Sequence, residues 1–287
     1  MKTLGLVVLA ALPLLAQRRW EDRWRFDERE TIRKTIDVTA GSGPKRLLVD
    51  NVSGFVHVTG YGGSQVQLVA EKHIFAVSGE AIQEAKRDVK LDLSQQGNFA
   101  RAYVDGPFRN RDGNGTNYRG DSYYGYRVVF DFDIQVPYDT ELVLKTINDG
   151  DIVVRKTTAD YEISGLNGGI EMEDVEGSGS VHTLNGKVKV SYTKNPPKAT
   201  SFHTLNGSID VYFQPGLNAD LSFQRLNGEI YSDFDVTTRA TNVPGSSSGG
   251  RFIYRGDRSL TARTGSGGPE FSFHTLNGTI RLHSKVF

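Results

Sequence analysis

Three histidines occupy matching points of one repeated motif, and imidazole is the side chain most suited to metal binding or proton exchange near neutral pH. His182, His203 and His274 each begin a His-Thr-Leu-Asn-Gly pentapeptide. If the copies stack, His182 and His203 come within side-chain contact, and two imidazoles can share Zn²⁺. No carboxylate recurs at this offset to complete a metal shell. We therefore interpret the histidines as a solvated polar ladder on a sheet face, and we expect no metal and no cofactor.

Aromatic and cationic side chains alternate in a second candidate site, the segment 106–125. This stretch has too few apolar residues to become ordered by packing, and a loop of this length in a compact domain is usually functional or disordered. Tyrosine and arginine together suit recognition of a glycan or a protein, although a mobile solvated loop is the alternative. The candidate ligand-binding residues are Arg109, Arg111, Tyr118, Arg119, Tyr123, Tyr124 and Tyr126.

Acidic residues cluster at 171–176 (EMEDVE). With Met172 inside, Glu171 and Glu173 would share the outer face, where carboxylates can bind Ca²⁺ or act as acid and base. No basic partner is identifiable in the sequence, so we interpret the cluster as a solvated strand face. Two Arg-Gly-Asp tripeptides, at 119–121 and 255–257, could bind a receptor, but chance copies are unsurprising in a chain of this composition.

Motifs of the common catalytic classes are absent. The sequence contains no H-E-x-x-H, no phosphate-binding loop and no dinucleotide fingerprint. It also contains no G-x-S-x-G elbow between an expected strand and an expected helix, because its match to that pattern at 245–249 lies in the glycine- and serine-rich insertion. We therefore predict that the protein is not an enzyme.

A Leu-Asn-Gly tripeptide recurs five times, preceded by a variant copy, Ile147-Asn148-Asp149-Gly150. Successive asparagines are 18 to 21 residues apart up to Asn227, and the last copy follows 50 residues later. Self-similarity at this period indicates stacked repeats. We expect a structural corner ladder made of Asn148, Asn167, Asn185, Asn206, Asn227 and Asn277 with Gly168, Gly186, Gly207, Gly228 and Gly278.

Each repeat reads as a strand, an Asn-Gly corner and a second strand. Apolar residues lie two after the glycine and four before the asparagine in every copy, and four after the glycine in every copy except the one with Ser232. Asn-Gly is also the strongest short signal for a two-residue β-hairpin, so a meander of hairpins is the alternative. A hairpin would expose the leucine before each asparagine, whereas a β-solenoid corner can turn it into the core. We therefore favour an all-β solenoid with rungs of about 18–21 residues and expect the glycines to adopt positive φ.

The chain has three expected parts. Residues 1–16 resemble a secretory signal peptide, with one lysine followed by an apolar run too short to span a membrane. Residues 17–140 form a β-rich part with one short helix at 79–90, and residues 141–287 form the repeats, interrupted by an insertion at 241–268.

Composition excludes several partners. The 34 basic and 34 acidic residues balance, so nothing indicates nucleic-acid binding. The chain has no cysteine, which excludes disulfides and a cysteine-linked lipid anchor. Beyond the signal peptide, we expect no transmembrane span.

Residues 130–137, 142–144 and 148–154, followed by the Leu-Asn-Gly series, resemble the bacterial putative adhesin family. This resemblance implies an exported, adhesin-like β-solenoid of unknown function with no catalytic residues. The two long glycine-rich insertions depart from the simplest family pattern.

The predicted function is accordingly an exported, non-enzymatic binding or scaffold protein of the bacterial cell envelope, whether periplasmic, on the outer surface or secreted. Its sheet faces and loops would recognise a glycan, an envelope component or a protein, and exposed edge strands would permit self-association. The alternatives are a carbohydrate-active β-solenoid lyase or hydrolase and a periplasmic structural or sensor-linked module. A groove with two or more carboxylates near a lysine or arginine would favour the enzyme.

Overall fold

The computed structural model describes residues 24–39, 42–109, 124–239, 246–248, 251–253 and 259–285. The chain divides into two compact units. The first comprises the described residues among 1–30, 72–90 and 105–129, and the second comprises those among 31–71, 91–104 and 130–287.

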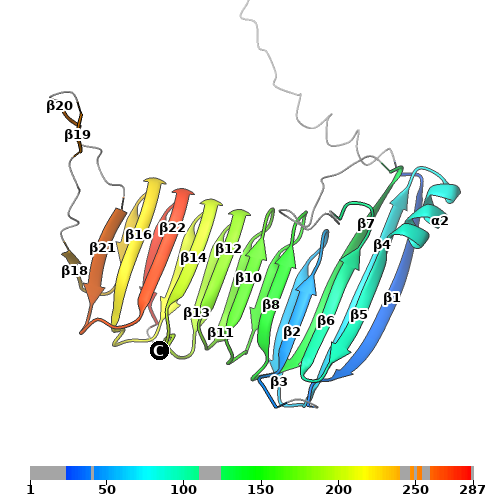
Figure 1. Cartoon of the computed structure of the whole chain (residues 1–287), viewed down its shortest axis with the longest axis horizontal. Coiled ribbons are helices and arrows are strands. Elements are labelled where there is room, and N and C mark those ends of the chain that lie inside the picture. The colour runs from blue at the N-terminus through cyan, green and yellow to red at the C-terminus, as the bar shows by residue number, and fades with distance from the viewer. Residues whose placement is uncertain are drawn as a thin grey trace, which may run out of the picture. The chain divides into compact units, whose positions relative to one another are not determined.

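The described part of the chain is all-β with one helix, and most of its strands belong to two large mixed sheets (Figure 1). Sheet A has the strand order β1 (Phe26–Asp37), β4 (Gln65–Ala76), β7 (Tyr126–Pro137), β3 (Val56–Tyr61), β9 (Ile152–Arg155), β11 (Ile170–Val175), β13 (Val188–Tyr192), β15 (Ile209–Phe213), β23 (Ile280–Ser284) and β17 (Ile230–Ser232). Sheet B has the order β18 (Val236–Arg239), β21 (Ser259–Thr264), β16 (Ala219–Asn227), β22 (Glu270–Asn277), β14 (Thr200–Asn206), β12 (Gly179–Asn185), β10 (Tyr161–Gly165), β8 (Glu141–Thr146), β2 (Arg46–Asp50), β6 (Phe99–Asp105) and β5 (Lys90–Gln96). A separate pair consists of β19 (Ser246–Ser248) and β20 (Arg251–Ile253).

The helix predicted in the first unit is present as α2 (Gly79–Asp88). It begins where the side chain of Ser78 accepts a hydrogen bond from the Ala81 amide at 3.2 Å, which satisfies one of the free amide donors of the first turn. Its buried face consists of Ala81, Ile82 and Ala85, as the helical spacing of these residues predicts.

In the second unit, each repeat contributes one strand to sheet B and the next to sheet A, and both pair in parallel with their counterparts from neighbouring repeats. Ile163 lies beside Val181 in sheet B, and Ile170 lies beside Val188 in sheet A. The strand before the Asn206-Gly207 corner is in sheet B and the strand after it is in sheet A. This arrangement excludes the two-residue hairpin. One repeat, with its two strands and corner, is called a rung below.

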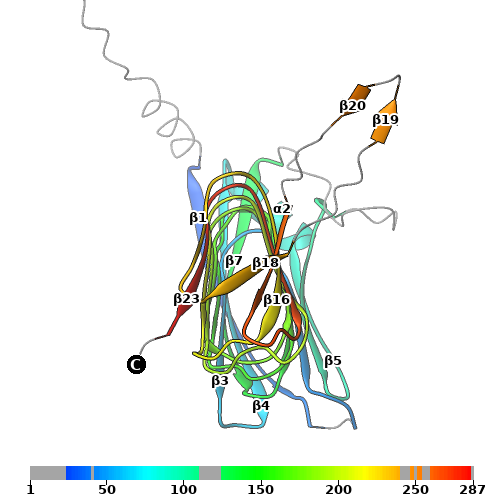
Figure 2. The ribbon, with the colours of Figure 1, turned by 90° about the vertical axis from the view of Figure 1, so that its left-hand side faces the viewer.

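The core of the second unit lies between the two sheets (Figure 2). The rings of Phe213 in sheet A and Phe271 in sheet B stack with centroids 5.4 Å apart, and the hydroxyls of Tyr161 and Tyr192 form a hydrogen bond between the sheets. The residues two after each corner glycine are almost fully buried in five of the six copies, namely Ile152, Ile170, Val188, Ile209 and Ile280. Alternation along each strand therefore predicts the core correctly.

The spatial order of the rungs differs from their order in the sequence. The last rung, β22 and β23, lies between β14–β15 and β16–β17 (Figure 1). Phe273 consequently stacks on Phe202 at 5.1 Å and on Phe223 at 5.2 Å. Residues 201–207 and 272–278 have the same sequence, SFHTLNG. These two identical segments, 71 residues apart, are neighbours in sheet B.

A column of glycines explains why the corners cannot accept another residue. A Cβ on Gly186 would lie 2.1 Å from the carbonyl oxygen of Gly168, and a Cβ on Gly207 would lie 2.0 Å from that of Gly186. The same close approach continues along Gly54, Gly150, Gly168, Gly186, Gly207, Gly278 and Gly228. Only Gly54 and Gly228 in this column have positive φ. The expectation that the corner needs glycine for its backbone angle is therefore wrong for most copies, because the closeness of neighbouring backbones imposes the requirement.

The leucine of each repeat does not turn into the core, contrary to the prediction. Leu166 is 37% exposed, and Leu184, Leu205, Leu226 and Leu276 are partly exposed. In the three His-Thr-Leu-Asn-Gly copies, the threonine one residue earlier is buried instead. Thr183 and Thr204 donate hydrogen bonds of 2.9 Å to the Gly168 and Gly186 carbonyls of the preceding rung. A buried hydroxyl needs such a partner, and the carbonyl beside it provides one.

The asparagine side chains form a hydrogen-bonded ladder along the corner. The amide of Asn185 donates to Asn167 at 2.8 Å, and that of Asn206 donates to Asn185 at 2.8 Å. The ladder continues through Asn277 to Asn227 at 2.8 and 2.7 Å, so it follows the spatial order of the rungs. At Asn148, the backbone amide donates a hydrogen bond to the Val52 carbonyl at 2.7 Å.

Replacing a corner glycine should destabilise the fold because a methyl group must displace backbone. We expect Gly207→Ala to lower the free energy of unfolding by about 1–3 kcal/mol, equivalent to roughly 2–12 °C in Tm. The control is Gly79→Ala, because a Cβ there meets no atom within 4 Å. Equal melting temperatures for the two variants in calorimetry would contradict the assignment.

Engineered disulfides test the order of the rungs in a chain that has no other cysteine. Ser201 and Ser272 are directly opposite on neighbouring strands, about 4.8 Å apart between Cα atoms, which a disulfide can span. The double variant Ser201→Cys/Ser272→Cys should therefore lose both free thiols on mild oxidation. Ser201→Cys/Ser222→Cys should keep them, because β22 separates those strands. The reverse result would show that the rungs follow chain order.

Candidate functional site

The outer face of sheet B in the second unit carries two adjacent columns of hydrogen-bonding side chains. One column contains Lys145, Ser164, His182, His203, His274 and Gln224, which the strand register places side by side. The other lies two residues earlier on each strand and contains Glu162, Ser180, Ser201, Ser272 and Ser222. Their spacing equals the separation of neighbouring strands, about 4.8 Å. A rigid parallel sheet therefore presents hydroxyl and imidazole groups at a regular interval.

The three histidines are in direct contact, as the repeat predicts. The Nδ1 atoms of His182 and His203 are 3.1 Å apart, a hydrogen-bond distance. The rings of His203 and His274 stack with centroids 4.2 Å apart. Partial burial and the neighbouring imidazoles lower the pKa of His203 to about 4, and burial also lowers the pKa of His182. Both rings are therefore neutral at pH 7.

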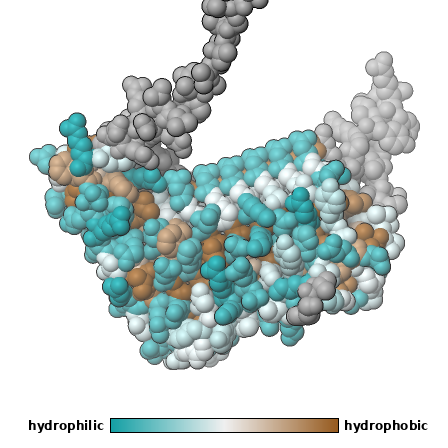
Figure 3. Space-filling model, turned by 180° about the vertical axis from the view of Figure 1, so that it is seen from behind, coloured by the Kyte–Doolittle hydropathy of each residue, from teal (hydrophilic) through white to brown (hydrophobic). Residues whose placement is uncertain are grey.

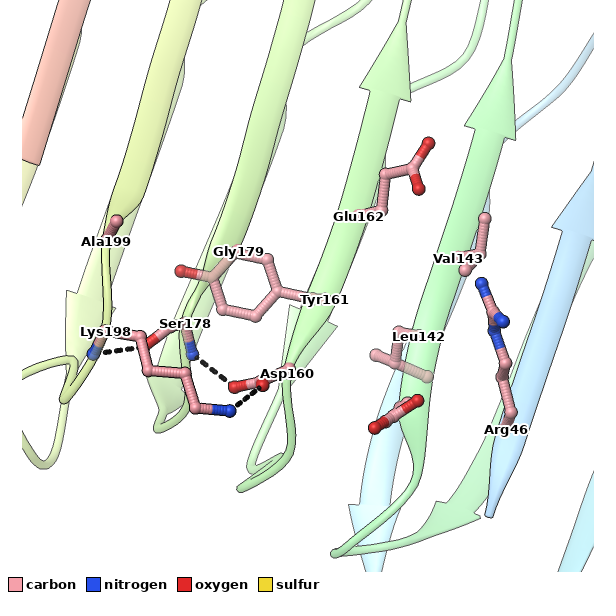
Figure 4. Close-up of a pocket in the computed structure, with 11 residues that line it drawn as sticks. Arg46, Leu142, Val143, Asp160, Tyr161, Glu162, Ser178, Gly179, Lys198 and Ala199 are labelled. Carbon is pink, nitrogen blue, oxygen red and sulfur yellow. Dashed lines mark hydrogen bonds and ion pairs between the residues drawn. The ribbon is translucent and has the colours of Figure 1, made fainter. Parts of the chain in front are cut away.

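A groove of about 300 Å³ opens in sheet B at the start of β8, β10 and β12 (Figure 4). Its charged side chains are Arg46, Glu141, Asp160, Glu162 and Lys198. Tyr161 and Gly179 also line it, and Gly179 has no side chain to fill the space between its neighbours. The groove thus combines hydrogen-bond acceptors and cationic donors beside an aromatic residue.

Asp160 is already held by its surroundings. Its carboxylate accepts a hydrogen bond from the Ser178 amide at 2.9 Å and from the Lys198 ammonium at 2.7 Å (Figure 4). Although burial acts in the opposite direction, these two donors lower the pKa of Asp160. A carboxylate kept ionised in this way can accept hydrogen bonds or position a ligand, but it is poorly suited to act as a general acid. Glu162 lies 3.7 Å from the ammonium of Lys145.

Hydrophilic side chains, with apolar ones between them, cover the face seen in Figure 3. On the outer face of sheet A in the second unit, charged side chains pair across neighbouring strands. Glu171 accepts a hydrogen bond from Lys189 at 2.6 Å, and Glu173 accepts one from Arg155 at 2.8 Å. The acidic cluster at 171–176 thus has basic partners on adjacent rungs, which the sequence did not reveal. A face whose charges are mutually neutralised offers little to an ionic ligand.

The predicted loop site is only partly described. Arg111, Tyr118, Arg119 and Tyr123 lie outside the described residues, as do both Arg-Gly-Asp tripeptides. Arg109 and Tyr126 are buried, with 4% and 8% of their surface exposed, and burial raises the pKa of Tyr126 to about 12. Tyr124 stacks on Tyr126 with centroids 5.7 Å apart. The structure therefore does not place Arg109 and Tyr126 on an exposed recognition surface.

Sequence reasoning missed the groove, although a signal for part of it exists. Glu141 and Asp160 are one repeat apart, and serines precede the histidine position by two residues in Ser180, Ser201 and Ser272. Aligning the repeats on their asparagines brings Glu141 and Asp160 into one column and the three serines into another. Arg46 and Lys198 have no such signal. Arg46 begins β2, where no Leu-Asn-Gly copy follows to mark the register, and Lys198 lies two residues before β14 begins.

Two further features bear on function. Among the described residues, no helix is long and apolar enough to cross a membrane. Within the same ranges, no three or more histidine, aspartate or glutamate side chains converge on a point that could hold a metal ion.

The histidine column predicts a loss of stability in mild acid. An unfolded histidine binds a proton near pH 6.5, whereas folded His203 does so only near pH 4. Between these values the unfolded state binds more protons, so stability falls as pH is lowered from about 6.5 to 4. After allowance for solvent screening, we expect a contribution on the order of 1 kcal/mol, or roughly 2–4 °C in Tm. His203→Gln, which copies the natural Gln224, should flatten this slope in melts recorded with a chelator; an unchanged slope would contradict the assignment.

The sequence matches no family model, and no curated protein matches it. Among solved structures, a putative cell adhesion protein from Clostridium sporogenes ATCC 15579 is similar at 12% identity and a TM-score of 0.44, covering 90% of this chain and 100% of that chain. A putative adhesin from Bacteroides fragilis NCTC 9343 is similar at 12% identity and a TM-score of 0.35, covering 88% and 97%. A putative lipid binding protein from Parabacteroides distasonis ATCC 8503 is similar at 11% identity and a TM-score of 0.28, covering 90% and 95%. Two of these names refer to adhesion, as does the family that the repeat resembles, but such distant similarity does not establish membership.

Proposed function

We propose that the parallel rungs form one β-solenoid and that the chain is an exported, non-enzymatic adhesin-like protein of the bacterial envelope. Strands from β2–β3 to β16–β17 support the solenoid, because every rung contributes one strand to each sheet in parallel register. The proposed ligand is a linear glycan, bound on the outer face of sheet B.

The observation that supports this proposal is the continuity between the groove and the two polar columns. Glu162 belongs to both, since it lines the groove and begins the column that continues through Ser180 and Ser201. Hydroxyl, imidazole and carboxylate groups together donate and accept hydrogen bonds, which matches the many hydroxyls of a sugar chain. A polymer lying across the strands would meet equivalent groups at each rung.

Charge distribution favours this face over the other. The outward acids of sheet A are engaged by Lys189 and Arg155 at 2.6 and 2.8 Å. Beyond the groove, sheet B instead offers serine hydroxyls and the neutral imidazoles of His182 and His203, whose hydrogen bonds to water are released at smaller cost than those of ions. A neutral ligand therefore exchanges water contacts for protein contacts most readily on sheet B.

A glycan and envelope-polysaccharide binding array tests the proposal. Arg46→Gln and Glu162→Gln should each weaken binding about 10-fold or more, because hydrogen bonds to charged groups contribute roughly 1.5–3 kcal/mol. Glu171→Gln, on the outer face of sheet A, is the matched control and should bind as the parent chain does. Absence of any glycan ligand, or equal loss in the control, would count against the site.

A second candidate function is a polysaccharide lyase or hydrolase, which the groove favours because three carboxylates lie near Arg46 and Lys198. Asp160 is the least suitable acid, since its pKa is lowered, which leaves Glu141 and Glu162 for proton transfer. Release of shorter or unsaturated products from a bound glycan, abolished in Glu141→Gln or Glu162→Gln while binding persists, would establish this activity. Intact polymer after prolonged incubation would support the scaffold.

A further inference from the structure

The histidine column has a geometry that a solvated ladder does not require. Side chains at equivalent positions of neighbouring strands can turn away from each other into water. The Nδ1 atoms of His182 and His203 are instead only 3.1 Å apart. The rings meet at 88°, so the two nitrogens approach from nearly perpendicular planes. His274 stacks against the far side of His203 at 4.2 Å and limits its rotation.

This separation suits two ligands of one metal ion. With metal–nitrogen bonds of about 2.05 Å, nitrogens 3.1 Å apart subtend an angle of about 98° at the metal. That angle lies between the 90° of square or octahedral coordination and the 109° of a tetrahedron. Neither imidazole needs to lose a proton: each ring can carry its single hydrogen on Nε2, so that both Nδ1 lone pairs are free.

We propose that His182 and His203 chelate a divalent transition-metal ion of the copper, nickel and zinc group on the outer face of sheet B. Imidazole suits these ions, and affinity among them is highest for Cu²⁺. The protein supplies two nitrogens, and water fills the remaining positions. His274 acts as a positioning residue through its stack on His203.

The sheet gives the site its rigidity. Thr183 and Thr204, which directly follow the two histidines, are fully buried and bonded to the Gly168 and Gly186 carbonyls at 2.9 Å. The two Cα atoms are therefore fixed in register on paired strands. Chelation consequently orders only the side chains, which limits the entropy lost on binding.

The test is a titration of the untagged full chain with CuCl₂ at neutral pH, followed by calorimetry and electron paramagnetic resonance. We expect one saturable site per chain with hyperfine coupling to two nitrogens. His203→Gln should weaken binding at least 10-fold, and it should fold because Gln224 occupies the equivalent position on β16. Thermal melting of the variant without metal verifies folding.

The control is His283→Gln. His283 is on sheet A, where it stacks on Tyr212 at 4.4 Å, away from the histidine column. This variant should retain the saturable site and its two-nitrogen signature. Non-saturable binding by the parent chain, a single-nitrogen or all-oxygen spectrum, or equal binding by His203→Gln would overturn the proposal. Because glycan binding is tested on different variants, Arg46→Gln and Glu162→Gln, failure of metal binding here leaves the glycan proposal unaffected.

Discussion

Contact between backbones at the glycine column is the constraint on which the second unit depends. Each carbonyl oxygen in the column lies too close to the next rung for a Cβ atom to fit there, as the Gly168 carbonyl does at Gly186. The same carbonyls accept hydrogen bonds from buried threonines such as Thr183 and Thr204. Each of these glycine carbonyl oxygens therefore fixes both the distance between two rungs and the lateral register of their strands. Since a slip of one residue would expose the core positions, this register maintains both the buried columns and the outward columns of histidine and serine.

The intercalated last rung imposes a further demand on folding. Strands β16 and β17 do not pair with β14 and β15, because β22 and β23 lie between them in the two sheets. Most of the hydrogen bonds of the last rung therefore join residues 50 or 71 positions apart, such as Asn227 with Asn277 and Asn206 with Asn277. Contacts of such separation form late because loop closure must precede them. On the far side of β16, the antiparallel strand β21 takes up the edge that a further parallel rung would use.

The two outer faces show how one repeat produces different surfaces. On sheet A, charges of opposite sign occupy neighbouring rungs, as at Glu171 and Lys189. On sheet B, like residues stack on like, as at His203 and His274. Identical ionic side chains would repel one another at such separation, whereas serine and neutral imidazole do not. The close contact of His182 and His203 is therefore compatible with stability, because the pKa of each imidazole is lowered and both are neutral at pH 7.

Sequence alone determined the all-β class, the helix near Ala81 and Ala85, and the alternation that buries Ile170 and Val188, because these follow from local periodicity. It also indicated that His182 and His203 meet, since a fixed repeat brings equivalent positions together. Three features were decided only by the tertiary structure. Whether threonine or leucine enters the core at a corner depends on a carbonyl from another rung. The neighbour of each rung depends on a non-local strand insertion. The groove contains Arg46, Glu141 and Lys198 from separate rungs. These residues come together only because their strands pair in parallel, so no local sequence pattern predicts that they are neighbours.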